Sequence, residues 1–310
     1  MTVHGAQSRP QTIVPHLWFD DRAEEAAAFY VSLFDGSRID HTSRYTETGF
    51  EVHGRPAGSV MNVDFALAGY RMLALNGGPA FRATPAISFF VTCEHEEELD
   101  ALWRALAEGG STLMERKRYD WSDEYGWVQD RFGVTWQLSL GRLEDVGQKI
   151  APCLTYVSEE GRAEQAVRRY VSLFDDSRVH GILHYGPGEA QPEGTVQHAQ
   201  FELAGDTFMA MDSSPEYADF SFNEAISLLV VCDSQEEIDR YWDGLTSGGD
   251  PTAQQCGWLR DRFGVAWQVW PSELGRMLSD DDPAKVERAT EAFLRMKKFD
   301  LDALRAAYRG

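Results

Sequence analysis

The side chains of this chain that could recognise a small molecule are aromatic, amide and imidazole groups, and they recur at matching places in its two halves. The first half offers His16, Trp18, Asn62, Asn76, Trp127 and Gln137, and their counterparts are Cys153, Thr155, His198, Asp212, Trp258 and Gln268. Apolar walls with a few convergent polar groups are typical of a small-molecule pocket. The alternative is that Trp127 and Trp258 only cover a hairpin.

Covalent and metal chemistry based on cysteine has less support. Cys153 or Cys256 as a nucleophile would need a placed base, and the sequence does not fix the geometry of His180, His184 or His198. The four cysteines show no C-x-x-C spacing. We therefore expect free thiols, not disulfides or a zinc site.

One octapeptide occurs twice and sets the domain organisation. Residues 130–137 and 261–268 differ only at Thr135 and Ala266. Asp-Arg-Phe-Gly predicts a tight turn in which glycine takes a positive φ, and Val-x-Trp-Gln predicts the following strand of a β-hairpin. A further block, residues 30–35, returns at 170–175, which is 170 − 30 = 140 positions later. A period of domain size indicates two homologous domains in tandem.

Hydrophobic periodicity predicts the same order of elements in both domains. In the first we expect strands at 13–19, 37–46, 59–68, 71–75 and 86–93, helices at 22–34 and 96–108, and a hairpin at 127–140. In the second we expect strands at 150–157, 195–203, 207–211 and 225–232 and helices at 162–174 and 235–245. Residues 46–58 are loop-like. Each domain is thus expected to contain two β-α-β-β-β modules, and the four modules could pair their sheets as two subunits of a dimer would.

The expected fold class is α+β. We expect a flexible N-terminus at 1–11, domains at 12–146 and 147–271, and a helical extension at 272–310. In that extension Asp282-Pro283 and Asp300 are typical of helix starts. An intrachain pseudo-dimer follows from this organisation, and a homodimer of the chain remains an alternative.

Charge and hydropathy exclude some classes of partner. The chain has 29 Lys and Arg against 50 Asp and Glu, a net charge of −21, which opposes binding to a nucleic-acid backbone. No run of 18 apolar residues exists, so we expect no membrane span. The polar N-terminus lacks a signal-peptide core, and the chain is expected to be cytoplasmic.

One segment is longer in the first domain than in the second. The residues at 115–125 include Arg116, Lys117, Arg118, Tyr119 and Trp121. An aromatic and basic loop could close over an anionic ligand. The alternative is a loop that simply packs on the surface.

Several motifs together resemble the PhnB-like branch of the vicinal oxygen chelate superfamily, which includes glyoxalase and bleomycin-resistance proteins. They are residues 15–19 (Pro-His-Leu-Trp-Phe), Glu-Glu-Ala at 24–26, 58–65, 73–78 and 126–133, with matches in the tail at 278–280, 296–298 and 306–308. The resemblance covers residues 12–310 and implies tandem domains of that fold. It does not identify an activity, because the superfamily hosts isomerases, dioxygenases, thiol transferases and drug-sequestering proteins. The branch is often labelled a demethylubiquinone methyltransferase, but no Gly-rich nucleotide loop supports a methyl donor.

The resemblance also implies where a catalytic metal would bind. Metal-dependent members place His, Gln or Glu on the first strands of the modules and a Glu on the last strand of the domain. The corresponding residues here are His16 and Cys153, Ser88 and Ser227, and Gln137 and Gln268. One imidazole and neutral amides make a poor divalent-metal site. We therefore expect no bound metal and no cofactor in either domain.

Two functions are consistent with these observations. The first is a small-molecule-binding protein without the usual catalytic metal. The alternative is a metal-dependent lyase, isomerase or dioxygenase that acts on a small vicinal-oxygen substrate through His16 and further ligands. The sequence leaves open whether the protein is an enzyme.

Overall fold

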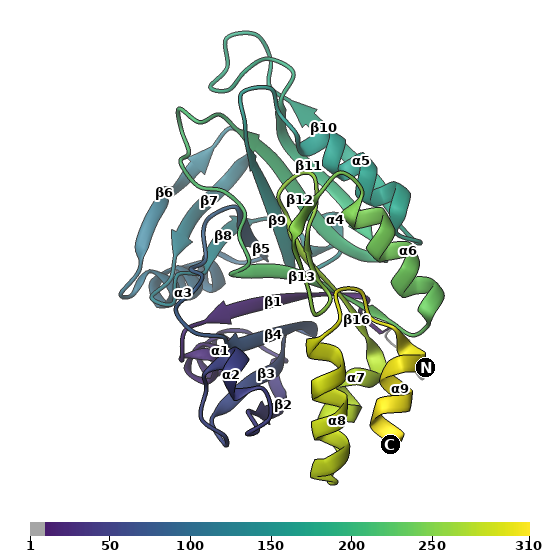
Figure 1. Cartoon of the computed structure of the whole chain (residues 1–310). Helices are drawn as coiled ribbons and strands as arrows, with labels where there is room; N and C mark the ends of the chain where they lie inside the picture. Colours follow the sequence, from purple (N-terminus) through teal and green to yellow (C-terminus); the bar gives the residue numbers. More distant parts are fainter. Residues whose placement is uncertain (1–9) are drawn as a thin grey trace, which may run out of the picture.

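The computed structural model describes residues 10–310 and contains two eight-stranded mixed sheets, each built from one half of each repeat (Figure 1). Sheet A has the strand order β14-β15-β16-β13-β1-β4-β3-β2, and sheet B has the order β10-β11-β12-β9-β5-β8-β7-β6. The first module of the first repeat therefore shares a sheet with the last module of the second repeat. The expected tandem of β-α-β-β-β modules is confirmed.

The first repeat contains eight strands and four helices among the described residues. Its elements are β1 (Ile13–Phe19), α1 (Ala23–Leu33), β2 (Arg38–Arg44), α2 (Phe50–His53), β3 (Val60–Leu67), β4 (Tyr70–Asn76), β5 (Ile87–Cys93), α3 (Glu96–Ala107), β6 (Ser111–Tyr119), β7 (Ser122–Gln129), β8 (Thr135–Leu140) and α4 (Leu143–Val146).

The second repeat follows the same plan and adds a helical tail. Its elements are β9 (Ile150–Val157), α5 (Ala163–Leu173), β10 (Arg178–His184), β11 (Val196–Leu203), β12 (Asp206–Ser213), β13 (Ile226–Cys232), α6 (Gln235–Thr246), β14 (Asp250–Gln255), β15 (Trp258–Arg260) and β16 (Ala266–Pro271). The tail consists of α7 (Ser272–Leu278), α8 (Pro283–Leu294) and α9 (Leu301–Arg309).

The modules join through their first strands. In sheet A, β1 pairs antiparallel with β13, and His16 lies opposite Ser227. In sheet B, β5 pairs antiparallel with β9, and Ser88 lies opposite Cys153. Because the two joints have the same form, the chain is an intrachain pseudo-dimer of two halves.

One side of each sheet is covered by amphipathic helices. Helices α1 and α6 pack on sheet A, and α3 and α5 pack on sheet B. The buried residues of α5, Ala163, Ala166, Val167 and Tyr170, follow the helical period. Burial of this face against the strands supplies the hydrophobic stabilisation that fixes where the strands, and any site on their other side, lie.

The repeated octapeptide connects the two sheets. The carboxylate of Asp130, which is 3 % exposed, accepts hydrogen bonds from the backbone of Phe132 and Val134 (2.8 and 3.1 Å), from Trp136 Nε1 (2.9 Å) and from the hydroxyl of Tyr30 (2.7 Å). Tyr30 belongs to α1 on sheet A, whereas Asp130 precedes β8 of sheet B. The predicted turn is confirmed, since Gly133 has φ +91°.

The second copy repeats this arrangement. Asp261 accepts from Phe263 N, Val265 N, Trp267 Nε1 and the Tyr170 hydroxyl at 2.9, 3.0, 3.0 and 2.5 Å. Gly264 again has a positive φ, +92°. The octapeptide is thus a structural joint, and in its first copy Thr135 and Gln137, two residues apart on β8, face the side of the sheet that the helices leave uncovered.

The structure differs from the sequence expectation in three segments of the first repeat and at β14 of the second repeat, where no strand was expected. Residues 46–58 contain the short helix α2, which is flanked by Gly49 and Gly54, both in the left-handed conformation. Residues 115–125 were expected to form a loop. They belong instead to the β6–β7 hairpin, whose two strands pair antiparallel at the edge of sheet B. There Arg116 pairs with Asp100 and with Glu124, the latter at 2.6 Å. Helix α4 was not expected.

The tail begins its helices where the sequence indicates. Asp282 accepts a hydrogen bond from Ala284 N at 3.0 Å, and Asp300 accepts one from Ala303 N at 2.9 Å. Phe299 is buried, and its ring lies 5.5 Å from that of Trp270 on β16. The tail therefore packs beside sheet A, as Figure 1 shows.

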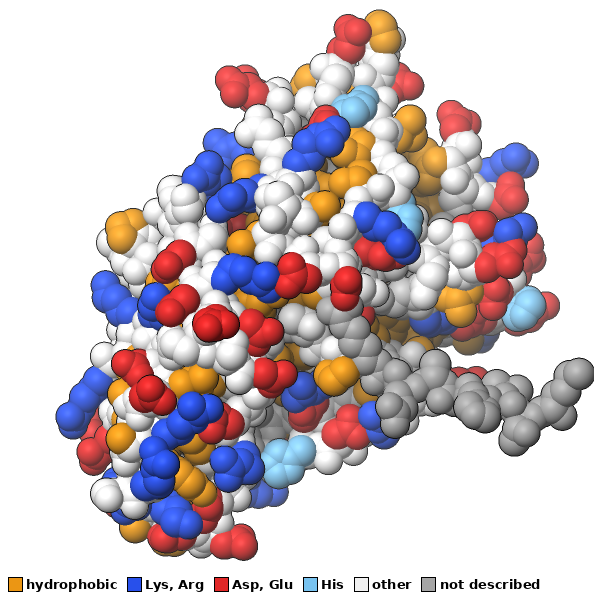
Figure 2. Space-filling view, turned by 90° about the vertical axis from the view of Figure 1, so that its right-hand side faces the viewer, with side chains coloured by type: hydrophobic (Ala, Val, Ile, Leu, Met, Phe, Trp, Pro, Cys, Tyr) orange, Lys and Arg blue, Asp and Glu red, His pale blue; other side chains and the backbone are white. Residues whose placement is uncertain are grey.

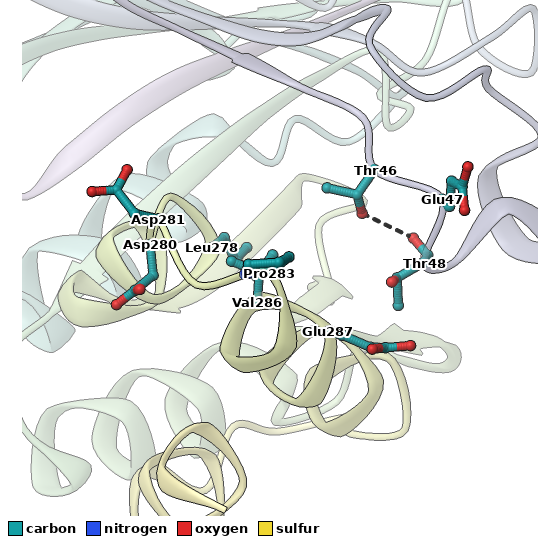
Figure 3. Close-up of a pocket in the computed structure, with 9 residues that line it drawn as sticks. All are labelled: Thr46, Glu47, Thr48, Leu278, Asp280, Asp281, Pro283, Val286 and Glu287. Atoms are coloured by element: carbon teal, nitrogen blue, oxygen red, sulfur yellow. Dashed lines mark hydrogen bonds between the residues drawn. The ribbon is translucent and has the colours of Figure 1, made fainter.

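A cavity of about 540 Å³ separates the tail from the loop at 46–48 (Figure 3). Four carboxylates line it, but they do not converge. Asp280 and Asp281 lie on one side of the view, and Glu47 and Glu287 lie on the other. Asp280 also accepts a hydrogen bond from the hydroxyl of Tyr308. The cavity is a gap between packed elements.

The surface carries charges of both signs. On the face shown in Figure 2, Lys and Arg side chains are interspersed with Asp and Glu, and no extended basic area is visible. In the described part of the chain, no helix combines the length and hydropathy needed to cross a membrane.

Candidate functional site

Period-two alternation separates the side chains on the helix-covered side of each sheet from those on the other side. On β1, Ile13, Leu17 and Phe19 belong to the hydrophobic core under the helices, so His16 and Trp18 face away from them. On β9, Leu154 and Tyr156 belong to that core, so Cys153 and Thr155 face away. We call the two uncovered sides cup A, on sheet A, and cup B, on sheet B.

By sequence, the twelve candidates fall into two groups of six, one in each repeat. In the structure, each cup combines candidates from both repeats. Cup A holds His16, Trp18, Asn62, Trp258 and Gln268. Cup B holds Cys153, Thr155, His198, Trp127 and Gln137. The reason is the pairing of modules across the repeats, so that the last strand of one repeat lies in the sheet of the first strand of the other.

Asn76 and Asp212 lie in neither cup. Asn76 shares the helix-covered side of β4 with Met72 and Ala74, and its Oδ1 accepts from Ala23 N at 2.8 Å at the start of α1. Asp212 accepts from Arg162 N, Ala163 N and Val196 N at 2.7 to 2.9 Å. Both side chains fix the start of a helix on its sheet. Strand alternation alone could have shown that they share a face with core residues.

Cup A contains a hydrogen-bonded cluster around His16. Gln268 Nε2 donates to His16 Nδ1 at 2.6 Å and to Ser227 Oγ at 2.9 Å. Because Nδ1 accepts, the ring proton is on Nε2, which donates to Asn62 Oδ1 at 3.3 Å. Burial lowers the pKa of His16 to about 4, against the smaller opposing effect of these two amides. The imidazole is therefore neutral at pH 7.

Two indole rings flank this cluster. The ring of Trp258 lies 6.2 Å from that of His16 and 6.3 Å from that of Trp18. Trp18 Nε1 donates to Gly78 O at 2.7 Å. The imidazole of His16, the amides of Asn62 and Gln268 and the indole N–H of Trp18 thus have partners within the protein.

Replacing Gly77 by Ala should disturb this wall of cup A. A Cβ at Gly77 would lie 2.3 Å from the Trp18 ring, and the φ of Gly77 is not positive, so the cost is steric. We expect a loss of about 1–3 kcal/mol in the free energy of unfolding, measured by urea denaturation. Gly181→Ala, where a Cβ has open space at an ordinary φ, is the control. Equal stability of the two variants would contradict the close contact.

Cup B has the same skeleton with different chemistry. Gln137 Nε2 donates to Ser88 Oγ at 2.7 Å, and Gln137 Oε1 accepts from the Tyr125 hydroxyl at 2.8 Å. Cys153 takes the place of His16, and burial raises the pKa of its thiol to about 12. A thiol held in this form is a poor nucleophile and a poor metal ligand. Tyr125 was not among the sequence candidates, because its segment had been expected to be a loop.

Several polar groups in cup B have no partner among the described residues. Trp127 Nε1 and Thr155 Oγ1 are buried without a hydrogen bond. The imidazole of His198 also has no hydrogen bond to another described residue. Its ring lies 6.5 Å from that of Phe90, and burial lowers its pKa. Around them are the apolar side chains of a separate small cluster, Ala151, Met209, Met211 and Phe90. Buried polar groups normally have partners, so this cup is the better candidate for a ligand.

The residues in the two cups do not fit a divalent metal. The positions implied by the resemblance do come together, as His16, Ser227 and Gln268 in cup A and as Cys153, Ser88 and Gln137 in cup B. Neither set contains a carboxylate, and the described residues include no group of three His, Cys, Asp or Glu that could hold a metal ion. Uncharged oxygen donors with one imidazole or one protonated thiol bind such ions weakly.

Comparison with known proteins identifies the family. A family model described as 3-demethylubiquinone-9 3-methyltransferase matches residues 11–139 and again residues 148–270. The chain belongs to this family. It is a PhnB-like protein of the vicinal oxygen chelate superfamily with two copies of the family's domain.

Two solved structures show how the PhnB-like chain relates to its neighbours. A PhnB protein from Bacillus cereus, described with the same methyltransferase label, is 41 % identical; the match covers 42 % of this chain and 100 % of that chain, with a TM-score of 0.39. Glyoxalase I from Zea mays is 8 % identical; the match covers 83 % of this chain and 92 % of that one, with a TM-score of 0.53, which supports the fold alone. A search of curated proteins gives no match.

Proposed function

We propose that this PhnB-like protein binds a neutral small molecule in cup B without a catalytic metal. The observation that carries the proposal is the pair of buried, unpartnered groups Trp127 Nε1 and Thr155 Oγ1 on the uncovered side of sheet B. An indole N–H can only donate, so the ligand should present an oxygen acceptor. The lowered pKa of His198 keeps that ring neutral and favours an uncharged ligand.

The difference between the cups supports cup B over cup A. The place that Thr155 occupies on β9 is occupied on β1 by Trp18, as their matching backbone hydrogen bonds to Ala86 O and Ala225 O indicate. Cup B therefore has a small hydroxyl side chain where cup A has an indole. The walls of cup B are apolar and aromatic, as is usual for sites that hold a small aromatic compound.

Replacing Trp127 by Phe should weaken binding in cup B. The change removes one hydrogen-bond donor and retains an aromatic wall, so we expect the Kd to rise about tenfold. Ligand-observed NMR of the whole chain against phenols and aryl ketones measures this. Trp258→Phe, the same change in cup A, is the matched control and should leave the Kd unchanged.

A blocking variant completes the test. Thr155→Trp introduces the residue that cup A carries at the equivalent place and should abolish binding. Absence of any phenol or aryl ketone that binds the parent chain, or binding that survives Thr155→Trp, would refute the proposal.

The alternative function is a metal-dependent lyase, isomerase or dioxygenase centred on His16. The proximity of His16, Ser227 and Gln268 favours this alternative, because they occupy the positions that the resemblance assigns to ligands. Metal analysis of the purified protein after incubation with Fe²⁺, Mn²⁺, Ni²⁺ or Zn²⁺ separates the two. Stoichiometric metal that His16→Cys removes would establish the alternative.

A further inference from the structure

A second pocket lies outside both cups, at the seam between the two modules of the first repeat. Its volume is about 510 Å³. Three segments enclose it: the end of β1 with the residues that follow (18–22), the crossover at 79–83, and the octapeptide turn at 129–133. Trp18 is the side chain that it shares with cup A.

Arginine and aromatic side chains dominate the lining. The guanidinium groups come from Arg22, Arg82 and Arg131, and the rings from Trp18, Phe19, Phe81 and Phe132. Arg22 and Arg131 both lie over the Phe132 ring, with Cζ to centroid distances of 4.5 and 5.0 Å. Three guanidinium groups at one cavity are notable in a chain whose net charge is −21.

Two of the three guanidinium groups have unused donors. Arg22 is held by Glu25 in a bidentate pair at 2.7 and 2.8 Å. Arg131 stacks over Phe29 at 4.0 Å, but neither it nor the side chain of Arg82 has a hydrogen bond or ion pair with a residue of the described range 10–310. A guanidinium presents several N–H groups in a planar fork that matches a carboxylate or phosphate.

The acidic residues at the pocket do not neutralise these donors. Asp20 pairs with Arg55 at 2.9 Å, and Asp21 is exposed beside Arg22. Glu25 neutralises the charge of Arg22. Of the other charged side chains that line the pocket, Arg82 and Arg131 are positive and only Asp21 is negative and without a partner cation of its own among the described residues. The pocket therefore favours an anion.

The second repeat does not contain this arrangement. Arg262 is the counterpart of Arg131, but its Nε and Nη2 donate to Ser247 O at 2.9 and 2.7 Å. Arg169 stands where the first repeat has Phe29, and it donates to Gly244 O at 2.9 Å. The free, stacked guanidinium is thus specific to the first repeat.

We propose that the seam pocket binds a small aromatic anion, whose carboxylate or phosphate pairs with Arg82 and Arg131 and whose ring lies among Trp18, Phe81 and Phe132. The rings of Phe81 and Trp18 are nearly perpendicular, with their centroids 5.1 Å apart, and a ligand ring can pack against such a pair in the same way. This proposal concerns a charged ligand and a separate cavity, and does not rest on the function proposed for cup B.

Titration calorimetry of the whole chain with benzoate, phenyl phosphate and benzyl alcohol tests it. We expect one equivalent of benzoate or phenyl phosphate to bind, and benzyl alcohol, which lacks the charge, to bind at least about tenfold more weakly. The preferred anion distinguishes a carboxylate site from a phosphate site. Arg82→Gln and Arg131→Gln should each raise the Kd about tenfold.

Matched variants make the result decisive. Arg262→Gln changes the counterpart in the second repeat and should leave the Kd unchanged. Thr155→Trp blocks cup B and should also have no effect, so failure of one proposal is distinguishable from failure of the other. Equal affinity for benzyl alcohol, unchanged binding in both Arg82→Gln and Arg131→Gln, or no saturable binding of either anion would overturn the proposal.

Discussion

Replacing Asp130 by Ala should lower the free energy of unfolding by about 3–5 kcal/mol, because four buried donors lose their acceptor at once. Those donors belong to the turn, to Trp136 and to Tyr30 on the other sheet. Urea denaturation followed by tryptophan fluorescence and by far-UV circular dichroism measures the loss. Asp261→Ala should cost a similar amount, since the second copy has the same contacts.

Two further variants separate the contacts from a general effect of removing an acid. Asp130→Asn can still accept from the two backbone amides, but its amino group opposes the Trp136 donor, so we expect a smaller loss of about 1–3 kcal/mol. Asp35→Ala, at an exposed position, should change stability by less than about 0.5 kcal/mol. If Asp130→Ala were as stable as Asp35→Ala, the joint between the sheets would not contribute to stability.

Acidification should destabilise the protein through His16. Its pKa is lowered to about 4 in the folded state, against 6.5 for an unperturbed imidazole. Between these values the unfolded chain binds the proton more tightly, so stability is fully present above pH 6.5 and falls as the pH drops toward 4. The loss attributable to this residue amounts to about 3 kcal/mol at pH 4.

The measurement is the free energy of unfolding as a function of pH, compared between the parent chain and His16→Cys. Cysteine is chosen for the variant because Cys153 occupies the position on β9 that His16 occupies on β1. The pKa of the Cys153 thiol is raised to about 12, so a buried thiol does not titrate in this pH range. A comparison is needed because burial raises the pKa values of Asp130 and Asp261, which makes stability fall with rising pH above 3.8. If the free energy of unfolding changed with pH in the same way for the parent chain and for His16→Cys, His16 would not be buried as a neutral imidazole.

The sequence predicted the elements that depend on local pattern. The strand at 13–19 and the helix at 22–34 agree with β1 and α1, because alternation and helical periodicity are set within one segment. The capping residues Asp282 and Asp300 were found for the same reason. The β6–β7 hairpin and α4 were missed, because edge strands with polar faces and helices of one turn give little periodic signal.

The repeat likewise determined that there are four modules, but not which modules share a sheet. That choice depends on β1 pairing with β13 and β5 with β9, and a strand contains no local record of its distant partner. Tertiary pairing therefore decided that Gln268 meets His16 and that Gln137 meets Ser88. It also decided that Trp127 and Thr155 are buried on one face without partners, because burial of a polar atom depends on every element packed around it.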